Sequence, residues 1–271
     1  MSSVLGLLLA KVAPVFMAQI LTNDEMVRWG WRVPLIVSSL TVIAAVAVLV
    51  ILHESPVFQA QAGADFFKAF VHFPIEIALV AGVAGLWFTG IWFVGDWVPI
   101  YLNDFTLQPI LYSFSIEVTA QVLLCVSLPL AGFLSDWKGR VDIMFLGALL
   151  LWVTIIPLFF LYTTGKPALV LLSDLCLFFM LALVGAPFFS WTSESFPSRL
   201  RCTAVGVGMN FSLAIFGGTA PAVASALLLE TQWDSAPSFF LTAMAVGAGV
   251  CLIFTKRLAP VPKYVDPDPA P

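Results

Sequence analysis

The sequence predicts an all-α membrane protein with about eight transmembrane helices. Hydrophobic residues occupy 61% of the 271 positions and charged residues only 10%, whereas roughly a quarter of the residues in soluble domains are charged. The mean hydropathy is +1.01. Because a helix needs about 20 apolar residues to cross a bilayer, a chain of this length and composition accommodates roughly eight such spans.

Eight apolar stretches, separated by polar segments, define the predicted helices in order along the chain. The first stretch is interpreted as a span because the sequence shows no basic segment and small-residue cleavage site of the kind that marks a signal peptide. The predicted spans cover residues 2–21, 33–52, 74–101, 110–134, 141–163, 168–190, 202–229 and 237–256.

Polar segments divide these spans into two groups, residues 1–52 and residues 74–256. The segment 53–73 between them is locally polar with mixed charge, which predicts a central cytoplasmic loop. The last residues, 257–271, are rich in Pro and Asp and predict a disordered cytoplasmic tail, because such a composition buries too little apolar surface to fold.

The distribution of basic residues predicts the orientation, since cytoplasmic loops of membrane proteins carry an excess of Lys and Arg. One set of loops and the tail holds eight basic residues, and the other set holds three. The two sets are Lys68, Lys138, Arg140, Arg199, Arg201, Lys256, Arg257 and Lys263 against Arg28, Arg32 and Lys166. Both termini are therefore expected in the cytoplasm, in a multi-pass protein of the plasma (inner) membrane.

Several function classes are disfavoured by composition and motifs. A net charge of −4 with short basic clusters argues against nucleic-acid binding. No hydrolase elbow, zinc-protease or phosphate-loop motif occurs, so neither an enzyme nor a cofactor is expected. None of the cysteines forms a C-x-x-C pair, which argues against a disulfide framework or metal site; they are Cys125, Cys176, Cys202 and Cys251.

Four charged side chains fall inside predicted spans, where each costs roughly 2.5–3.5 kcal/mol at midspan: Lys11, Asp96, Glu117 and Asp174. Ser113 and Gln121 lie four residues before and after Glu117, so these three side chains share one helix face. Asp96 and Asp174 lie nearer the ends of their spans, where an interfacial position would also explain them. Glu117 fits either a pathway role or a satisfied structural carboxylate, and Lys11 either a pathway role or a misplaced span.

Residues 132–142, GFLSDWKGRVD, join two predicted spans with an unusual density of charge and glycine. This segment resembles the cytoplasmic signature loop of the major facilitator superfamily, G-x-x-x-D-R-x-G-R-R. Trp137 and Val141 stand where that family usually has basic residues. The positions that match are Gly132, Asp136, Gly139 and Arg140.

Further segments resemble one branch of that superfamily, the metabolite:proton symporters, which include proline/betaine, 2-oxoglutarate, citrate and shikimate carriers. WGWRVPLIVSSL, followed about one span later by HESPVF, resembles the region of the fifth and sixth helices. ESFPSRLRCTAVG at 194–206 and MNFSLAIFGGTAP at 209–221 resemble the loop before the eleventh helix and that helix itself.

The resemblance implies a twelve-helix fold of two six-helix bundles, of which this chain would hold helices five to twelve and lack the first four. It further implies secondary active transport by alternating access, as proton symport of a small organic metabolite such as a carboxylate or zwitterion. The alternative is a non-transporting truncated remnant or membrane interaction protein. Expected partners are the lipid bilayer, the metabolite, the proton, and either the missing N-terminal helices or another transporter chain.

Two sets of site residues follow from the resemblance together with the membrane charges. The substrate and proton pathway would use Lys11, Asp96, Glu117, Gln121, Asp174 and Asn210. Gating would use Gly132, Asp136, Gly139, Arg140, Glu194, Arg199 and Arg201. Asp136, Arg140, Glu194 and Arg201 are expected to form an ion-pair network, and Lys11 is expected to pair with Glu117.

Overall fold

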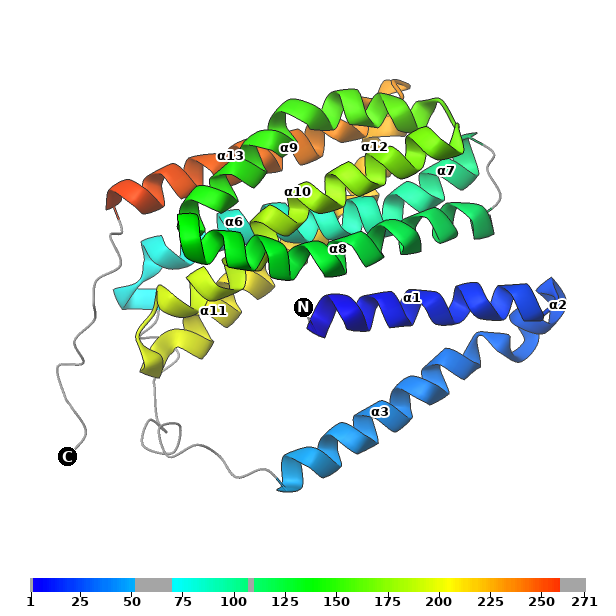
Figure 1. Ribbon diagram of the computed structural model, residues 1–271, viewed down its shortest axis with the longest axis horizontal. Helices are drawn as coiled ribbons and strands as arrows, with labels where there is room; N and C mark the ends of the chain where they lie inside the picture. The colour runs from blue at the N-terminus through cyan, green and yellow to red at the C-terminus, as the bar shows by residue number, and fades with distance from the viewer. Residues whose placement is uncertain (1, 52–69, 107–109, 259–271) are drawn as a thin grey trace. The chain divides into compact units, whose positions relative to one another are not determined.

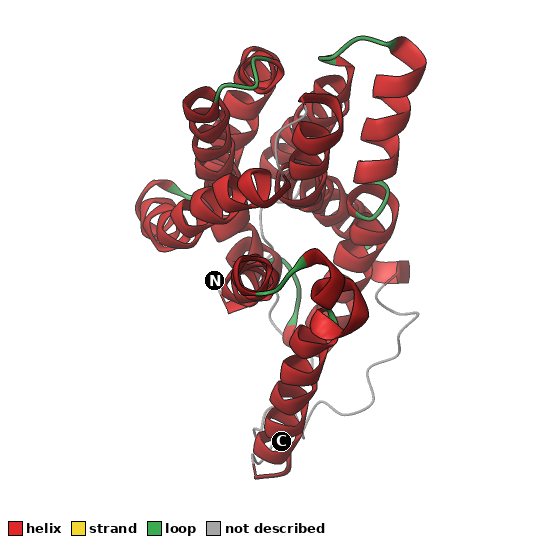
Figure 2. Cartoon of the chain, turned by 90° about the vertical axis from the view of Figure 1, so that its right-hand side faces the viewer, coloured by secondary structure: helices red, strands yellow, loops and turns green. Residues whose placement is uncertain are grey.

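The computed structural model describes residues 2–51, 70–106 and 110–258, and the described residues are helices joined by short turns (Figures 1 and 2). They fall into two compact units, one with α1 to α3 and one with α6 to α13. Most of the predicted loop 53–73 and of the predicted tail 257–271 lies outside the described residues.

The first unit is a helical hairpin made of α1 (Ser2–Ile20), α2 (Asn23–Glu25), the π-helical turn η1 (Met26–Gly30) and α3 (Arg32–Ile51). Its turn begins with a capping box, in which Thr22 and Glu25 satisfy each other's backbone N–H groups. The Thr22 amide donates to Glu25 Oε2 at 2.9 Å, and the Glu25 amide donates to Thr22 Oγ1 at 3.4 Å. The hydrogen bonds that the amide and the hydroxyl group of Thr22 donate to the Glu25 carboxylate lower the pKa of Glu25.

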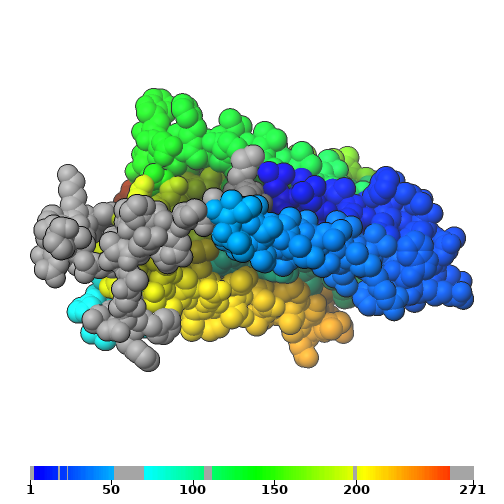
Figure 3. Space-filling model, turned by 90° about the horizontal axis from the view of Figure 1, so that it is seen from below, coloured from blue at the N-terminus to red at the C-terminus, as the bar shows by residue number. Residues whose placement is uncertain are grey.

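After its first residue, Arg32, the helix α3 is apolar apart from two serines and a threonine, and none of its residues is buried. Figure 3 shows its side chains, in light blue, at the surface from one end of the helix to the other. A helix that is hydrophobic all round is stable in a bilayer or inside a larger protein. Its surroundings are therefore lipid or other membrane helices.

The second unit contains six long helical spans in an antiparallel arrangement (Figure 1). Two of the six are interrupted by a π-helical turn, and four are continuous. In order they are α6–η2–α7 (Pro74–Trp92, Phe93–Trp97 and Val98–Thr106), α8 (Ile110–Lys138), α9 (Arg140–Thr163), α10 (Pro167–Glu194), α11–η3–α12 (Ser198–Ser212, Leu213–Gly217 and Ala220–Thr231) and α13 (Ala236–Leu258).

The predicted fold class is confirmed by these helices. Among the described residues, seven helices are long and apolar enough to cross a membrane, and α1 contributes a shorter apolar helix at Ser3–Met17. Several helices run beyond the predicted ends, for example α7 to Thr106 and α8 to Lys138. Hydropathy marks the apolar part of a span, whereas a helix continues for as long as its backbone hydrogen bonds are made.

Small residues let the helices of the second unit approach closely, as is typical of membrane bundles. A Cβ atom on Gly185 of α10 would lie 2.1 Å from Cζ3 of Trp87 on α6. A Cβ atom on Gly90 of α6 would lie 2.3 Å from a methyl carbon of Leu181. The core between α6 and α10 therefore depends on the absence of side chains at these two positions.

The π-helical turns interrupt the first and fifth spans of this unit, a feature that hydropathy did not predict. Turns of this kind widen a helix locally and are frequent at functional sites. Helix α6 packs against α11 and η3, while η2 packs against α12. The indole Nε1 of Trp97 in η2 donates to Ser225 Oγ in α12 at 2.9 Å. The two interrupted spans thus contact each other on both sides of their turns.

Candidate functional site

The joint between α8 and α9 is a single residue, Gly139. Its φ angle is +103°, a conformation that glycine adopts readily and side-chain-bearing residues rarely do. The sequence predicted a loop from 135 to 140, and this boundary is wrong because α8 continues to Lys138 and α9 begins at Arg140. The Gly139 amide still donates to the carbonyl oxygen of Ser135 at 2.9 Å, which completes the last turn of α8.

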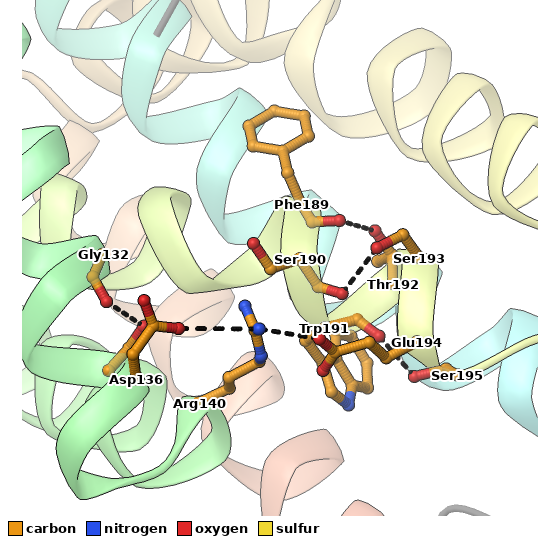
Figure 4. Close-up of polar contacts among 11 residues, drawn as sticks. Gly132, Asp136, Arg140, Phe189, Ser190, Trp191, Thr192, Ser193, Glu194 and Ser195 are labelled. Atoms are coloured by element: carbon orange, nitrogen blue, oxygen red, sulfur yellow. Dashed lines mark hydrogen bonds and ion pairs between the residues drawn. The ribbon is translucent and has the colours of Figure 1, made fainter. Parts of the chain in front are cut away.

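Arg140 connects three helix ends at this joint (Figure 4). Its Nη2 lies 2.7 Å from Glu194 Oε1 at the end of α10 and 3.5 Å from Asp136 Oδ1 on α8. The planar guanidinium group has donors enough for both carboxylates. We call Asp136, Arg140 and Glu194 the charged latch, because together they connect α8, α9 and α10.

Three other predicted gating residues, Arg201, Arg199 and Gly132, do not take part in this latch. Arg201 Nε donates to the carbonyl oxygen of Phe196 at 3.4 Å, in the turn that leads to α11, and it makes no ion pair with the described residues. The structure therefore brings together three of the four members of the expected network. Arg199 lies in α11, and its side chain is outside the described part of the structure. The carbonyl oxygen of Gly132 accepts a hydrogen bond from Ser135 Oγ at 2.7 Å.

The polar face of α8 is buried. Ser113, Glu117 and Gln121, placed on one face by their spacing of four residues, are each 1% exposed. Leu124, Ile116 and Ala120 of the same helix are buried as well. Glu117 thus places an ionisable group in an environment where an uncompensated charge is costly, as a residue that binds a proton or a charged ligand would require.

Asp174 on α10 is also buried, at 1% exposure. Its Oδ1 accepts a hydrogen bond from the hydroxyl group of Tyr162, near the end of α9. The neighbouring Ser173 hydroxyl is directed elsewhere and donates to the carbonyl oxygen of Leu158 at 2.9 Å. The protein therefore shields Asp174 from solvent, and its interfacial position in the membrane stays a prediction. Tyr162 was missed because no signal in the sequence indicates which face of α9 meets α10.

The sequence model that describes the Major Facilitator Superfamily matches residues 6–221 of this chain. The chain belongs to this superfamily. The family suggested by GFLSDWKGRVD is therefore confirmed, and it is a family of membrane transporters rather than enzymes. The chain is accordingly a multi-pass membrane protein.

Three relatives illustrate the similarity within the superfamily. A protein of Staphylococcus aureus (strain COL) named for proline/betaine transport is 26% identical over 251 residues, covering 89% of this chain and 53% of that protein. The inner membrane metabolite transport protein YhjE of Escherichia coli (strain K12) is 28% identical, covering 93% of this chain and 59% of that protein. The ectoine/proline transporter ProP of Corynebacterium glutamicum is 26% identical, covering 83% and 48%. The chain spans about half the length of the curated relatives it matches.

The other residues predicted to line the pathway, Asp96, Asn210 and Lys11, lie in different surroundings. Asp96 lies in the π-helical turn η2 and is half-buried. Asn210 is exposed, and its amide group donates to the carbonyl oxygen of Gly206 in the same helix at 2.7 Å. Lys11 lies in α1 of the other unit, so its pairing with Glu117 stays a prediction.

One further ion pair was not predicted from the sequence. Lys256 near the end of α13 pairs with Asp142, in the first turn of α9. The two residues are 114 positions apart, and only the packing of α13 against α9 brings them together. Among the described residues, no cluster of three His, Cys, Asp or Glu side chains could hold a metal ion.

Proposed function

We propose that this chain forms part of a secondary active transporter that carries a small organic metabolite, a carboxylate or zwitterion, together with a proton. The superfamily match supports transport, and the relatives named for proline, betaine and ectoine support the zwitterion class. The observation that carries the proposal is the charged latch, in which one arginine connects the ends of three membrane helices.

The latch suits alternating access because it is strong enough to select a conformation and weak enough to open. Asp136 and Glu194 are more than half exposed, at 65% and 53% of the side chain, and ion pairs of that kind contribute about 0–1 kcal/mol. Separation of α8 from α10 would break one of the two contacts of Arg140. Helix ends held in this manner move as rigid bodies between two packings.

The buried carboxylates provide the proposed proton sites. Glu117 and Asp174 lie on α8 and α10 and are both buried. A buried carboxylate that is compensated by a positive charge or hydrogen bonds in only one of two conformations would change its affinity for a proton between them. A proton could therefore bind in one conformation and leave in the other. Gln121 and Ser113, on the same face as Glu117, would offer hydrogen bonds to a polar substrate.

The proposed orientation places both termini and the latch in the cytoplasm, on the basis of the eight-to-three excess of basic residues. It can be tested by single-cysteine labelling after the native cysteines have been replaced. A cysteine at Lys138, which is exposed in the turn beside the latch, should react with a membrane-impermeant reagent only after the cells are opened. Labelling of this cysteine from outside intact cells would show that the orientation is the opposite of the one proposed.

A second candidate function is that of a membrane interaction protein that does not transport by itself. One observation favours it: α3 buries none of its residues. The bundle of α6 to α13 would then fold in the bilayer and associate with other membrane helices.

Uptake by reconstituted vesicles distinguishes the two functions. The chain is purified, reconstituted with an imposed proton gradient, and supplied with radiolabelled proline, betaine or ectoine. Uptake that collapses with a protonophore supports transport. If none of these substrates is taken up and a second membrane chain copurifies, the result supports the interaction protein.

A further inference from the structure

The beginning of α9 is held by charges from more than one direction. Arg140, the first residue of α9, contacts Asp136 and Glu194 of the charged latch. Asp142, two residues later, pairs with Lys256 near the end of α13. Asp136, Arg140 and Glu194 belong to the segments that resemble the superfamily, whereas Asp142 and Lys256 match no position of its motifs.

The helical geometry puts the two sets of contacts on opposite sides of α9. Consecutive residues of an α-helix are separated by about 100°, so positions 140 and 142 point about 200° apart. Residues two apart in a helix do not face each other. Arg140 accordingly reaches α8 and α10, whereas Asp142 reaches α13. The first turn of α9 is thus held between these contacts.

The joint before this turn is short and carries no side chain. Gly139 is a single residue between two long helices, with a φ angle of +103°. Asp142 Oδ2 lies 3.2 Å from the place where a Cβ atom on Gly139 would be, so its carboxylate lies back over the joint. A small rotation about Gly139 would move the start of α9, and with it the guanidinium group of Arg140.

We propose that the Lys256–Asp142 ion pair is a second arm of the charged latch, which fixes the first turn of α9 and thereby positions Arg140 for Glu194. Lys256 and Asp142 are positioning residues in this arrangement. Through this arm, α13 is connected to α8, α9 and α10. The ends of these four helices would then move apart or come together as a group. The ion-pair geometry is independent of transport, and only its consequence for gating rests on the proposed function.

Exposure is consistent with a reversible contact of this kind. The side chains of Lys256 and Asp142 are 51% and 56% exposed, while Arg140 is 27% exposed. Half-exposed charges are stripped of little water when they pair, so the pair can break without a large desolvation penalty. Two weak arms on opposite sides of one turn restrain its direction better than either arm alone.

The test measures the distance between α8 and α10 while the charges on α13 and α9 are changed. Spin labels are attached at Phe133 on α8 and Phe189 on α10, which are both exposed, in the full chain reconstituted in lipid nanodiscs without its native cysteines. Lys256→Ala and Asp142→Asn should each increase the separated population about two- to fivefold, the factor that an exposed ion pair supports. Arg140→Ala should do the same or more.

Rescue and control variants separate positioning from general destabilisation. Lys256→Arg and the exchange Lys256→Asp with Asp142→Lys should return the distance distribution toward that of the unmodified protein. Lys138→Ala removes an exposed charge from the same joint, where Lys138 contacts only the ring of Trp137 among the described residues, and should leave the distribution unchanged.

Two results would overturn the proposal. In the first, the variants at Lys256 and Asp142 leave the α8–α10 distance unchanged while Arg140→Ala alters it. In the second, Arg140→Ala itself has no effect, so that there is no contact for the second arm to support. A chain that fails to take up substrate but shows the expected distance changes contradicts the transport function and leaves the second arm in place.

Discussion

Trp97 and Ser225 connect the two interrupted spans of the six-helix unit. The indole Nε1 of Trp97, at the end of η2, donates to Ser225 Oγ in α12 at 2.9 Å. The ring of Trp97 is only 2% exposed and stacks on Tyr101 with a centroid distance of 5.2 Å. A buried indole N–H group requires an acceptor, so this hydrogen bond fixes which residues of the two spans lie side by side.

Replacing Trp97 with Phe should therefore destabilise the protein by more than the loss of aromatic area alone. Phe preserves a ring for stacking on Tyr101 but removes the donor to Ser225. A hydrogen bond of this type contributes about 0.5–1.5 kcal/mol to stability, and the smaller ring leaves a cavity that adds to the loss. Thermal unfolding in detergent measures the change. Trp233→Phe is the control, because Trp233 is 51% exposed, and an equal loss in both variants would contradict the expectation.

Tyr162→Phe is expected to destabilise the protein by about 1–3 kcal/mol, since it removes a donor from a buried carboxylate. The hydroxyl group of Tyr162 donates to Asp174, and both residues are buried. The matched control is Tyr101→Phe, because Tyr101 is also buried and its hydroxyl makes no hydrogen bond with the described residues. Chemical denaturation in mixed micelles would show the difference. A Tyr162→Phe variant as stable as Tyr101→Phe would mean that the hydroxyl contributes nothing to holding Asp174.

Hydropathy alone predicted the order of the spans in this fold, because apolar stretches of bilayer length have few alternatives to a membrane helix. It did not predict the π-helical turns at Phe93–Trp97 and Leu213–Gly217. Both turns lie inside predicted spans. The extra residue that a π-helical turn contains does not change the mean hydropathy of its span. Their position depends on contacts between spans, such as that of Trp97 with Ser225.

The candidate site was predictable where residues are close in sequence and not where they are close only in space. The spacing of four residues placed Ser113, Glu117 and Gln121 on one buried face. The motif indicated Asp136 and Arg140, which are only four residues apart in the sequence. In contrast, the pairs Tyr162–Asp174 and Asp142–Lys256 depend on which helices are neighbours, and one sequence does not contain that information.

Gly139→Ala should disrupt the joint between α8 and α9, whereas Gly132→Ala should not. A left-handed conformation such as the φ of +103° at Gly139 costs a residue other than glycine roughly 1–3 kcal/mol. Gly132 lies inside α8, and a Cβ atom there would meet nothing within 4 Å. Alanine at Gly132 should raise helix propensity and stabilise the protein by roughly 0.5–1 kcal/mol. Thermal unfolding midpoints that fall equally for both glycines would contradict this assignment of their roles.

The final prediction concerns the charged latch itself. In a full-length transporter that contains this segment, Arg140→Ala and Asp136→Asn should each reduce gradient-driven uptake severalfold while leaving membrane insertion near its original level. Arg140 lies 2.7 Å from Glu194 and 3.5 Å from Asp136. These charges are partly exposed, so each replacement should reduce stability by at most about 1 kcal/mol, too little to prevent folding. Uptake is expected to fall because the charges bias two conformations of similar free energy, and a bias of about 1 kcal/mol changes the ratio of the two conformations about fivefold. Lys138→Ala, in the same joint, is the control and should transport normally. Uptake is measured per molecule at the membrane, and normal uptake by either latch variant at a normal level of insertion would show that Arg140 does not gate the transporter.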